Sequence, residues 1–186
     1  VFVLPQALAR RGPQIAEGLK NSVTLGVGQF CTKPGLIFAV DGPELAAFQA
    51  RLAELFQQAA PATMLHAGIR NAYDAGLART AGTSGVSRLG TSEQSADSGK
   101  NQAAVAVFAT DAATFTAQAQ LREENFGPSS MVVACRDRAE LLRQIEGLDG
   151  HLAASVHGTD QDLLDYADVV ALLETKVGRI VVNGFT

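Results

Sequence analysis

The stretch LIFAVDGPE, residues 36–44, decides the fold class. Residues 36–40 form an unbroken apolar run, which is typical of a strand buried on both faces of a sheet. Asp41 and Gly42 end the run, and Pro43 suits the first turn of a helix. Apolar residues then recur at helical spacing, at Leu45, Phe48, Leu52, Leu55 and Phe56. A buried strand therefore passes directly into an amphipathic helix, the unit from which helix-covered parallel sheets are built.

The same alternation continues on both sides of this stretch. Further apolar runs predict strands at 1–4, 105–108, 130–134, 152–156 and 179–182. Helical patterns cover 8–23 (interrupted by Gly12-Pro13), 64–79, the stretch after a cap at Asp137 with Glu140 three positions on, and 159–173. Residues 81–102 are rich in Gly, Ser and Thr and are expected to run over the surface. The pattern predicts an α/β fold with a largely parallel sheet.

Composition excludes several classes of protein. The chain has 186 residues, 47% of them hydrophobic and 18% charged, which suits one folded domain rather than a disordered segment. A net charge of −4 does not favour nucleic-acid binding, and no apolar run is long enough to predict a membrane span. Two Cys and three scattered His form neither a disulfide framework nor a zinc pattern, so no metal is expected.

The two ends of the chain lie in or next to apolar runs. The sequence starts at Val1 without a Met, inside the run VFVL, and stops at Thr186 soon after the run IVV. We therefore expect a segment of a longer polypeptide, in which any targeting signal would lie outside these residues.

The stretch GVGQFCTKPG, residues 26–35, is predicted to be a loop that carries the thiol of Cys31. Glycines on either side allow the backbone to approach a ligand, a backbone N–H could stabilise an oxyanion, and Lys33 could favour the thiolate. In the alternative interpretation, Cys31 is a small buried hydrophobic residue and Lys33 is a solvated charge.

A second candidate site is EENFGP, residues 123–128, just before the strand predicted at 130. Gly127-Pro128 forces a turn, and a carboxylate held there can accept hydrogen bonds from two ribose hydroxyls while an aromatic ring packs on a flat ligand. The alternative is a solvated acidic pair followed by a core Phe.

Together, GQFCT at 28–32 and EE-x-FGP at 123–128 resemble the motifs of the NAD(P)-dependent aldehyde dehydrogenases, in that family's order. The resemblance extends over essentially the whole chain and includes GRIVVNG at 178–184. Residues 28–36, ML-x-x-GI-x-x-x-Y at 64–73 and HGT at 157–159 are similar to a narrower branch, the α-ketoglutaric semialdehyde (2,5-dioxopentanoate) dehydrogenases. The resemblance implies the catalytic-domain type of fold, a three-layer sandwich around a mostly parallel sheet.

The resemblance also implies roles for individual residues. Cys31 would be the nucleophile, which carries the substrate as a thiohemiacetal and then a thioester while hydride passes to NAD or NADP. Glu124 would hold the nicotinamide ribose, and Phe126 would pack near the nicotinamide ring. Phe30 would be either a wall of the aldehyde pocket or a core residue, and Glu123 takes no role from the family.

Other parts of the family's machinery do not match these residues. The general-base Glu and the oxyanion Asn lie upstream in the family, as does the dinucleotide-binding domain, and Glu17 and Asn21 fit neither motif. We therefore expect residues 1–186 to be a catalytic-domain segment that is inactive alone and lacks the oligomerisation arm. The full-length protein would be a cytoplasmic bacterial homo-oligomer that oxidises a small aldehyde.

Three alternatives stay open at this point. The aldehyde could be another short semialdehyde, such as succinic semialdehyde. The chain could instead be a non-catalytic α/β module that binds a nucleotide or a partner. Cys135 is expected to be a structural thiol, and His157 a loop His that could face a ligand but more simply finds a protein partner.

Overall fold

A seven-stranded sheet between two layers of helices organises the computed structural model, which describes residues 1–186. The strand order is β4-β6-β7-β2-β1-β8-β9, and every pair is parallel except β4 with β6. The strands are β1 (Phe2–Val3), β2 (Leu36–Val40), β4 (Ser87–Thr91), β6 (Ala106–Asp111), β7 (Ser129–Cys135), β8 (Ala154–His157) and β9 (Ile180–Val182). A separate two-stranded ribbon pairs β3 (Ala62–Thr63) with β5 (Gln102–Ala103).

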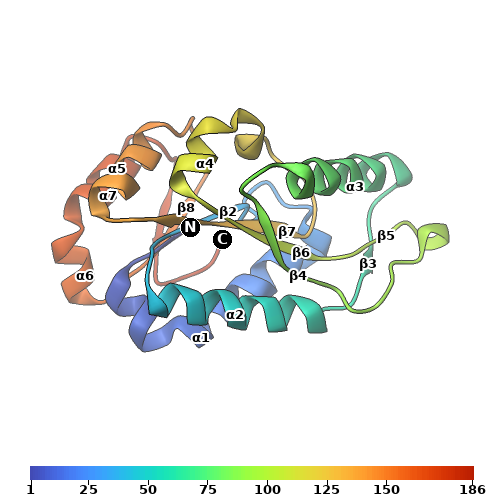
Figure 1. Cartoon of the computed structure of the whole chain (residues 1–186), viewed down its shortest axis with the longest axis horizontal. Coiled ribbons are helices and arrows are strands. Elements are labelled where there is room, and N and C mark those ends of the chain that lie inside the picture. The colour runs from blue at the N-terminus through green and yellow to red at the C-terminus, as the bar shows by residue number, and fades with distance from the viewer.

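Helices cover both faces of the sheet (Figure 1). One face is covered by α1 (Pro5–Thr24) and α2 (Pro43–Gln58). The layer on the other face holds α3 (Ala67–Gly82), α4 (Ala112–Ala117), α5 (Arg138–Glu146) and α7 (Ala167–Glu174). The short helix α6 (Asp160–Asp165) lies at one end of the molecule. Short 3₁₀ turns occur at η1 (Leu25–Gly28), η2 (Ser98–Lys100) and η3 (Ala119–Arg122). The predicted three-layer α/β sandwich around a mostly parallel sheet is confirmed. No helix has both the length and the apolar character needed to cross a membrane.

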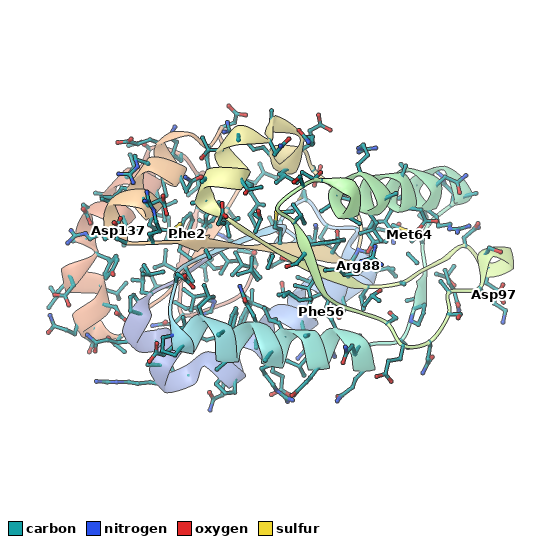
Figure 2. The ribbon with its side chains drawn as sticks, viewed as in Figure 1. Phe2, Phe56, Met64, Arg88, Asp97 and Asp137 are labelled. Atoms are coloured by element: carbon teal, nitrogen blue, oxygen red, sulfur yellow. The ribbon has the colours of Figure 1, made fainter.

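The strands are apolar on both faces because each face packs on its own core. Along β2, Phe38 points into the core beneath α4, α5 and α7, whereas Ile37 and Ala39 point into the core beneath α1 and α2. The five apolar positions predicted for α2 are all buried, among them Phe56, which lies between that helix and the sheet (Figure 2).

The helix α1 runs unbroken through Gly12-Pro13, so the predicted interruption there is wrong. A proline normally disfavours the helical conformation of the residue before it through a clash with that residue's Cβ, and Gly12 has none. Pro13 and Ala9 are both exposed, so the Ala9 carbonyl that loses its intrahelical donor faces water.

The prediction of surface loop over 81–102 is also partly wrong, because the stretch contains β4. This edge strand pairs with β6 through a register shift between Arg88 and Gly90. A Cβ on Gly90 would stand 2.7 Å from the Ala53 carbonyl oxygen, so glycine lets the strand lie close against α2. The chain then extends away from the sheet through η2, with Asp97 near its tip, before it returns in β5 (Figure 2).

The region predicted as one helix from 159 to 173 forms two helices, α6 and α7, which meet at Tyr166. The cap predicted at Asp137 is present, since its carboxylate accepts a hydrogen bond from the Glu140 N–H at 2.8 Å. Glu140 does not complete a capping box, because its own carboxylate accepts hydrogen bonds from the backbone and guanidinium of Arg136 instead.

A buried carboxylate far along the chain caps α1. The residue before this helix is Leu4, which has no side-chain acceptor, and the first turn contains no acidic residue. Asp162, 1% exposed, accepts hydrogen bonds from the N–H groups of Gln6 and Ala7 at 3.0 and 2.8 Å and also from Thr159 N–H within its own capping box. One side chain therefore fixes the start of both α1 and α6.

Replacing Asp162 tests this double cap. We expect Asp162→Ala to lower the free energy of unfolding by roughly 2–4 kcal/mol, because it leaves one buried and two partly buried N–H groups without this acceptor. The matched control is Asp160→Ala, which removes an exposed carboxylate from the same helical turn and should cost under about 1 kcal/mol. Urea denaturation measures both, and equal losses for the two variants would contradict the assignment.

Candidate active site

The two candidate motifs meet because they precede neighbouring parallel strands. Residues of β2 and β7 pair in parallel, from Leu36 with Met131 to Val40 with Cys135. Cys31 lies shortly before β2, and Glu124 lies shortly before β7. Two loops that enter adjacent parallel strands lie at the same edge of the sheet, so residues far apart in sequence come together at its amino-terminal edge.

A cleft of about 460 Å³ occupies this edge. At one end it is lined by Cys31, Lys33, Glu124 and Phe126, and it extends to the loops before β8 and β9. The structure thus brings the nucleophile and cofactor candidates into one cleft. Phe30 is not among the residues that line it: its side chain is 48% exposed and lies over Gly26, so it is not a core residue either.

Cys31 is exposed, which rules out the alternative of a buried hydrophobic residue. The backbone N–H of Cys31 makes no hydrogen bond within the chain, so it is available to a ligand oxygen. Cys135, by contrast, is fully buried at the end of β7. Burial, reinforced by the negative charges of Glu140 and Asp137, raises its thiol pKa to about 12, as expected for a structural thiol.

The carboxylate of Glu124 is exposed and accepts no hydrogen bond from the chain, so its acceptor positions are open. Phe126 is half-buried beside it at the cleft wall, and the alternative of a core Phe is wrong. Glu123 is exposed as well and also borders the cleft.

Lys33 makes a contact that neither interpretation from the sequence included. Its ammonium donates hydrogen bonds to the carbonyls of Asn125 and Ser129, at 3.2 and 2.8 Å, and none to the Cys31 thiol. It is partly buried rather than a solvated surface charge. Loss of hydration lowers the pKa of Lys33 to about 8, although the negative charge of Glu124 opposes the shift.

The start of α3 supports both loops, a role that sequence reasoning missed. Met64, Tyr73 and Ala103 form a small core of their own. Val27 packs against this core from the loop that carries Cys31, residues 26–35, called here the nucleophile loop. The Leu65 N–H donates to the side-chain carbonyl of Gln29 at 2.9 Å. These contacts come from the stretch ML-x-x-GI-x-x-x-Y, which the sequence marked only through its similarity to the narrower branch.

Two glycines let the loops touch through their backbones. Gly28 has φ = 65°, and a Cβ there would overlap the carbonyl of Gly127. Gly127 has φ = 149°, and a Cβ there would overlap the Tyr73 ring. The hydroxyl of Tyr73 is anchored by donating to the Ala104 carbonyl at 2.8 Å. Tyr73, Gly127 and Gly28 thus stack in order from α3 to the nucleophile loop.

His157 lies outside the residues that line the cleft, and the expectation of a satisfied loop His is wrong. It is buried at the end of β8, its Nε2 has no hydrogen-bond partner, and its ring packs 4.9 Å from that of Phe185. Burial, with a contribution from the positive charge of Arg11, lowers the pKa of this imidazole to about 4. No group of three or more His, Cys, Asp or Glu side chains is arranged to hold a metal ion.

Comparison with known proteins gives this cleft its context. No protein-family model matches the chain. Over its whole length the chain is 40% identical to alpha-ketoglutaric semialdehyde dehydrogenase 2 of Azospirillum brasilense and 34% identical to alpha-ketoglutaric semialdehyde dehydrogenase of Acinetobacter baylyi. The whole chain is therefore similar to part of two semialdehyde dehydrogenases. It spans 35% of the length of each of these two curated relatives.

A solved aldehyde dehydrogenase structure shares the fold. A protein from Sinorhizobium meliloti 1021, assigned to methylmalonate-semialdehyde dehydrogenase and solved in complex with NAD, superposes with a TM-score of 0.78 at 14% identity. The match covers 98% of this chain and 38% of that one. The fold is therefore retained at a level of identity where few side chains are shared.

The backbone contact between the loops can be tested at Gly28. Gly28→Ala should lower the free energy of unfolding by about 2 kcal/mol or more, because alanine is strained at this positive φ and its Cβ overlaps Gly127. Gly82→Ala is the control, since that helical glycine has open space around it and tolerates a methyl group. Thermal or urea unfolding compares them, and a neutral Gly28→Ala would show that the loops are not in contact.

Proposed function

We propose that this chain carries the nucleophile of an NAD(P)-dependent semialdehyde dehydrogenase that oxidises α-ketoglutaric semialdehyde to α-ketoglutarate. The observation that supports this most is the meeting of the exposed Cys31 with Glu124 and Phe126 in one cleft. The proposed substrate rests on the identity to two proteins named alpha-ketoglutaric semialdehyde dehydrogenases.

The residues at this end of the cleft fit a nicotinamide dinucleotide, either NAD or NADP. The free carboxylate of Glu124 can accept hydrogen bonds from the two hydroxyls of a ribose, and the Phe126 ring offers a flat apolar surface to a nicotinamide. When bound, the cofactor supplies the acceptor for the hydride that leaves the aldehyde carbon.

Cys31 carries the substrate through the reaction. Its thiolate sulfur forms a bond to the aldehyde carbon, and the carbonyl π electrons move to the oxygen, which becomes an oxyanion. The free N–H of Cys31 can donate to that oxyanion. Departure of hydride re-forms the carbonyl and leaves a thioester on the sulfur. Water then adds to the thioester carbon and gives one proton to the general base of the longer polypeptide, the sulfur leaves as thiolate, and the carboxylic acid is released.

The rest of the machinery belongs, in this proposal, to a longer polypeptide. Residues 1–186 act as the catalytic-domain segment. The general base, the oxyanion Asn and the dinucleotide-binding domain come from the part of the longer polypeptide that lies outside these residues. The full-length protein assembles as a cytoplasmic homo-oligomer, as the resemblance implies.

Two assays test the catalytic role. Residues 1–186 alone should show no NAD(P)-dependent oxidation, whereas the full-length enzyme should oxidise α-ketoglutaric semialdehyde with a higher kcat/KM than succinic semialdehyde. In the full-length enzyme, Cys31→Ala should abolish oxidation and leave cofactor binding intact, while Cys135→Ala, the matched control in the core, retains turnover. Oxidation by Cys31→Ala would remove Cys31 from its role, and a preference for succinic semialdehyde would change the substrate.

Thiol labelling distinguishes the enzyme from a non-catalytic binding module. In the full-length protein at neutral pH, iodoacetamide should alkylate Cys31 far faster than Cys135 and also faster than free cysteine, because an activated thiolate reacts faster than a thiol that is merely exposed. Peptide mapping by mass spectrometry follows both rates. Slow and equal labelling of the two cysteines would favour the module.

A further inference from the structure

We propose that Lys33 is a positioning residue, which holds the nucleophile loop in register with the turn that carries Glu124 and Phe126. This inference rests on the proposed function and concerns a side chain to which that mechanism gives no part. Lys33 is two residues from Cys31, and its ammonium contacts the other loop rather than its own.

The two carbonyl acceptors of Lys33 lie on either side of the turn at residues 126–128, which follows Glu124. The Asn125 carbonyl lies next to Glu124 in sequence, and the Ser129 carbonyl begins β7, so Phe126, Gly127 and Pro128 lie between the two hydrogen bonds. One charged donor thus fixes both sides of the turn. Hydrogen bonds from a charged group are stronger than those between neutral groups, and a partly buried one is shielded from competing water.

The other hydrogen bonds between the two loops lie at their bases. The Ser130 hydroxyl donates to the Pro34 carbonyl at 2.8 Å, and the Met131 N–H donates to the Gly35 carbonyl at 2.9 Å, both where the strands begin. Gly28 touches Gly127 on the other side of the nucleophile. Among the hydrogen bonds between the two loops, those of Lys33 are made by the residue nearest to Cys31 in sequence.

The cost of burying this ammonium argues that the contact is specific. Lys33 forms no ion pair within 4.0 Å, and its partial burial depresses its pKa towards neutrality. A lysine that served only solubility would extend into water. Hydride transfer depends steeply on the distance and angle between donor and acceptor, so the register of the two loops controls the rate.

Lys176 provides a matched control. Its ammonium also donates to two backbone carbonyls, those of Glu146 and Leu148, at 2.8 and 3.0 Å, and its side chain, like that of Lys33, is partly buried. It clamps the α5–β8 connection, far along the chain from both motifs, but it borders the far end of the cleft, so it is a control for hydrogen exchange and not for turnover. The variants Lys33→Met and Lys176→Met therefore remove the same chemical interaction from two different places.

The experiment compares these variants in the full-length enzyme by two measurements. In Lys33→Met, backbone hydrogen exchange should accelerate about tenfold at residues 123–130. In Lys176→Met, it should accelerate only near residues 146–151. A tenfold change corresponds to a loss of about 1.4 kcal/mol of local stability in each variant. In Lys33→Met, kcat should fall roughly 10- to 100-fold, and the kinetic isotope effect with aldehyde deuterated at the reacting carbon should rise as hydride transfer becomes rate-limiting. The kinetic control is Lys20→Met, which makes the same substitution on α1 outside the cleft and should keep both kinetic values.

The outcomes separate the possibilities. Unchanged exchange at 123–130 in Lys33→Met overturns the clamp, and faster exchange with unchanged kcat and isotope effect reduces Lys33 to a stabilising residue, which also overturns the proposal. If the wild-type enzyme oxidises no semialdehyde, the proposed function fails, while hydrogen exchange still decides whether the clamp exists. If Lys33→Met does not fold, Lys33→Gln is measured in its place, because its polar side chain lets water reach the two carbonyls that lose the ammonium.

Discussion

The parallel pairing of β2 with β7 is the constraint on which the rest of the site depends. The loops that precede these strands have no choice but to emerge side by side, because parallel neighbours start at the same edge of a sheet. Cys31 and Glu124 are brought together by this pairing, although nearly half of the chain separates them. The buried faces of both strands fix the register, since a slip of one residue would turn the side chains of each core toward the wrong layer.

The cleft lies at the edge of the sheet opposite to the usual one. In open α/β sheets ligands generally bind beyond the carboxyl ends of the strands. Here those ends pass straight into helices, and side-chain caps occupy three of the helix starts, with Asp111 before α4, Asp137 before α5 and Thr159 before α6. Each cap accepts a backbone N–H that a ligand could otherwise bind, whereas α2, after β2, begins at Gly42 without a side-chain cap. The amino-terminal edge receives longer loops, and these provide the room for a site.

Much of the architecture could be predicted from local pattern, because it reflects local chemistry. The run at 36–40 reflects a strand buried on both faces, and the five apolar positions of α2 follow the helical period after a start marked by Pro43. The continuity of α1 depends on the missing Cβ of Gly12, and β4 has a sequence, SRLGT, whose pairing with β6 and packing on α2 outweigh its weak propensity. The target of Lys33 could not be predicted, since it depends on which strands are neighbours. The packing of Tyr73 against Gly127 could not be predicted for the same reason, although the motif at 64–73 could be seen in the sequence.

The placement of the two cysteines also determines what oxidation can do. Cys31 is before the first residue of β2, and Cys135 is the last residue of β7, so roughly 20 Å of strand lies between them. A disulfide requires Cα atoms within about 7 Å, so these thiols cannot form one without unfolding the sheet. A sulfenic acid formed on Cys31 would find no resolving thiol within the chain. Its rescue would depend on small thiols such as glutathione, and prolonged peroxide stress would drive it to irreversible acids.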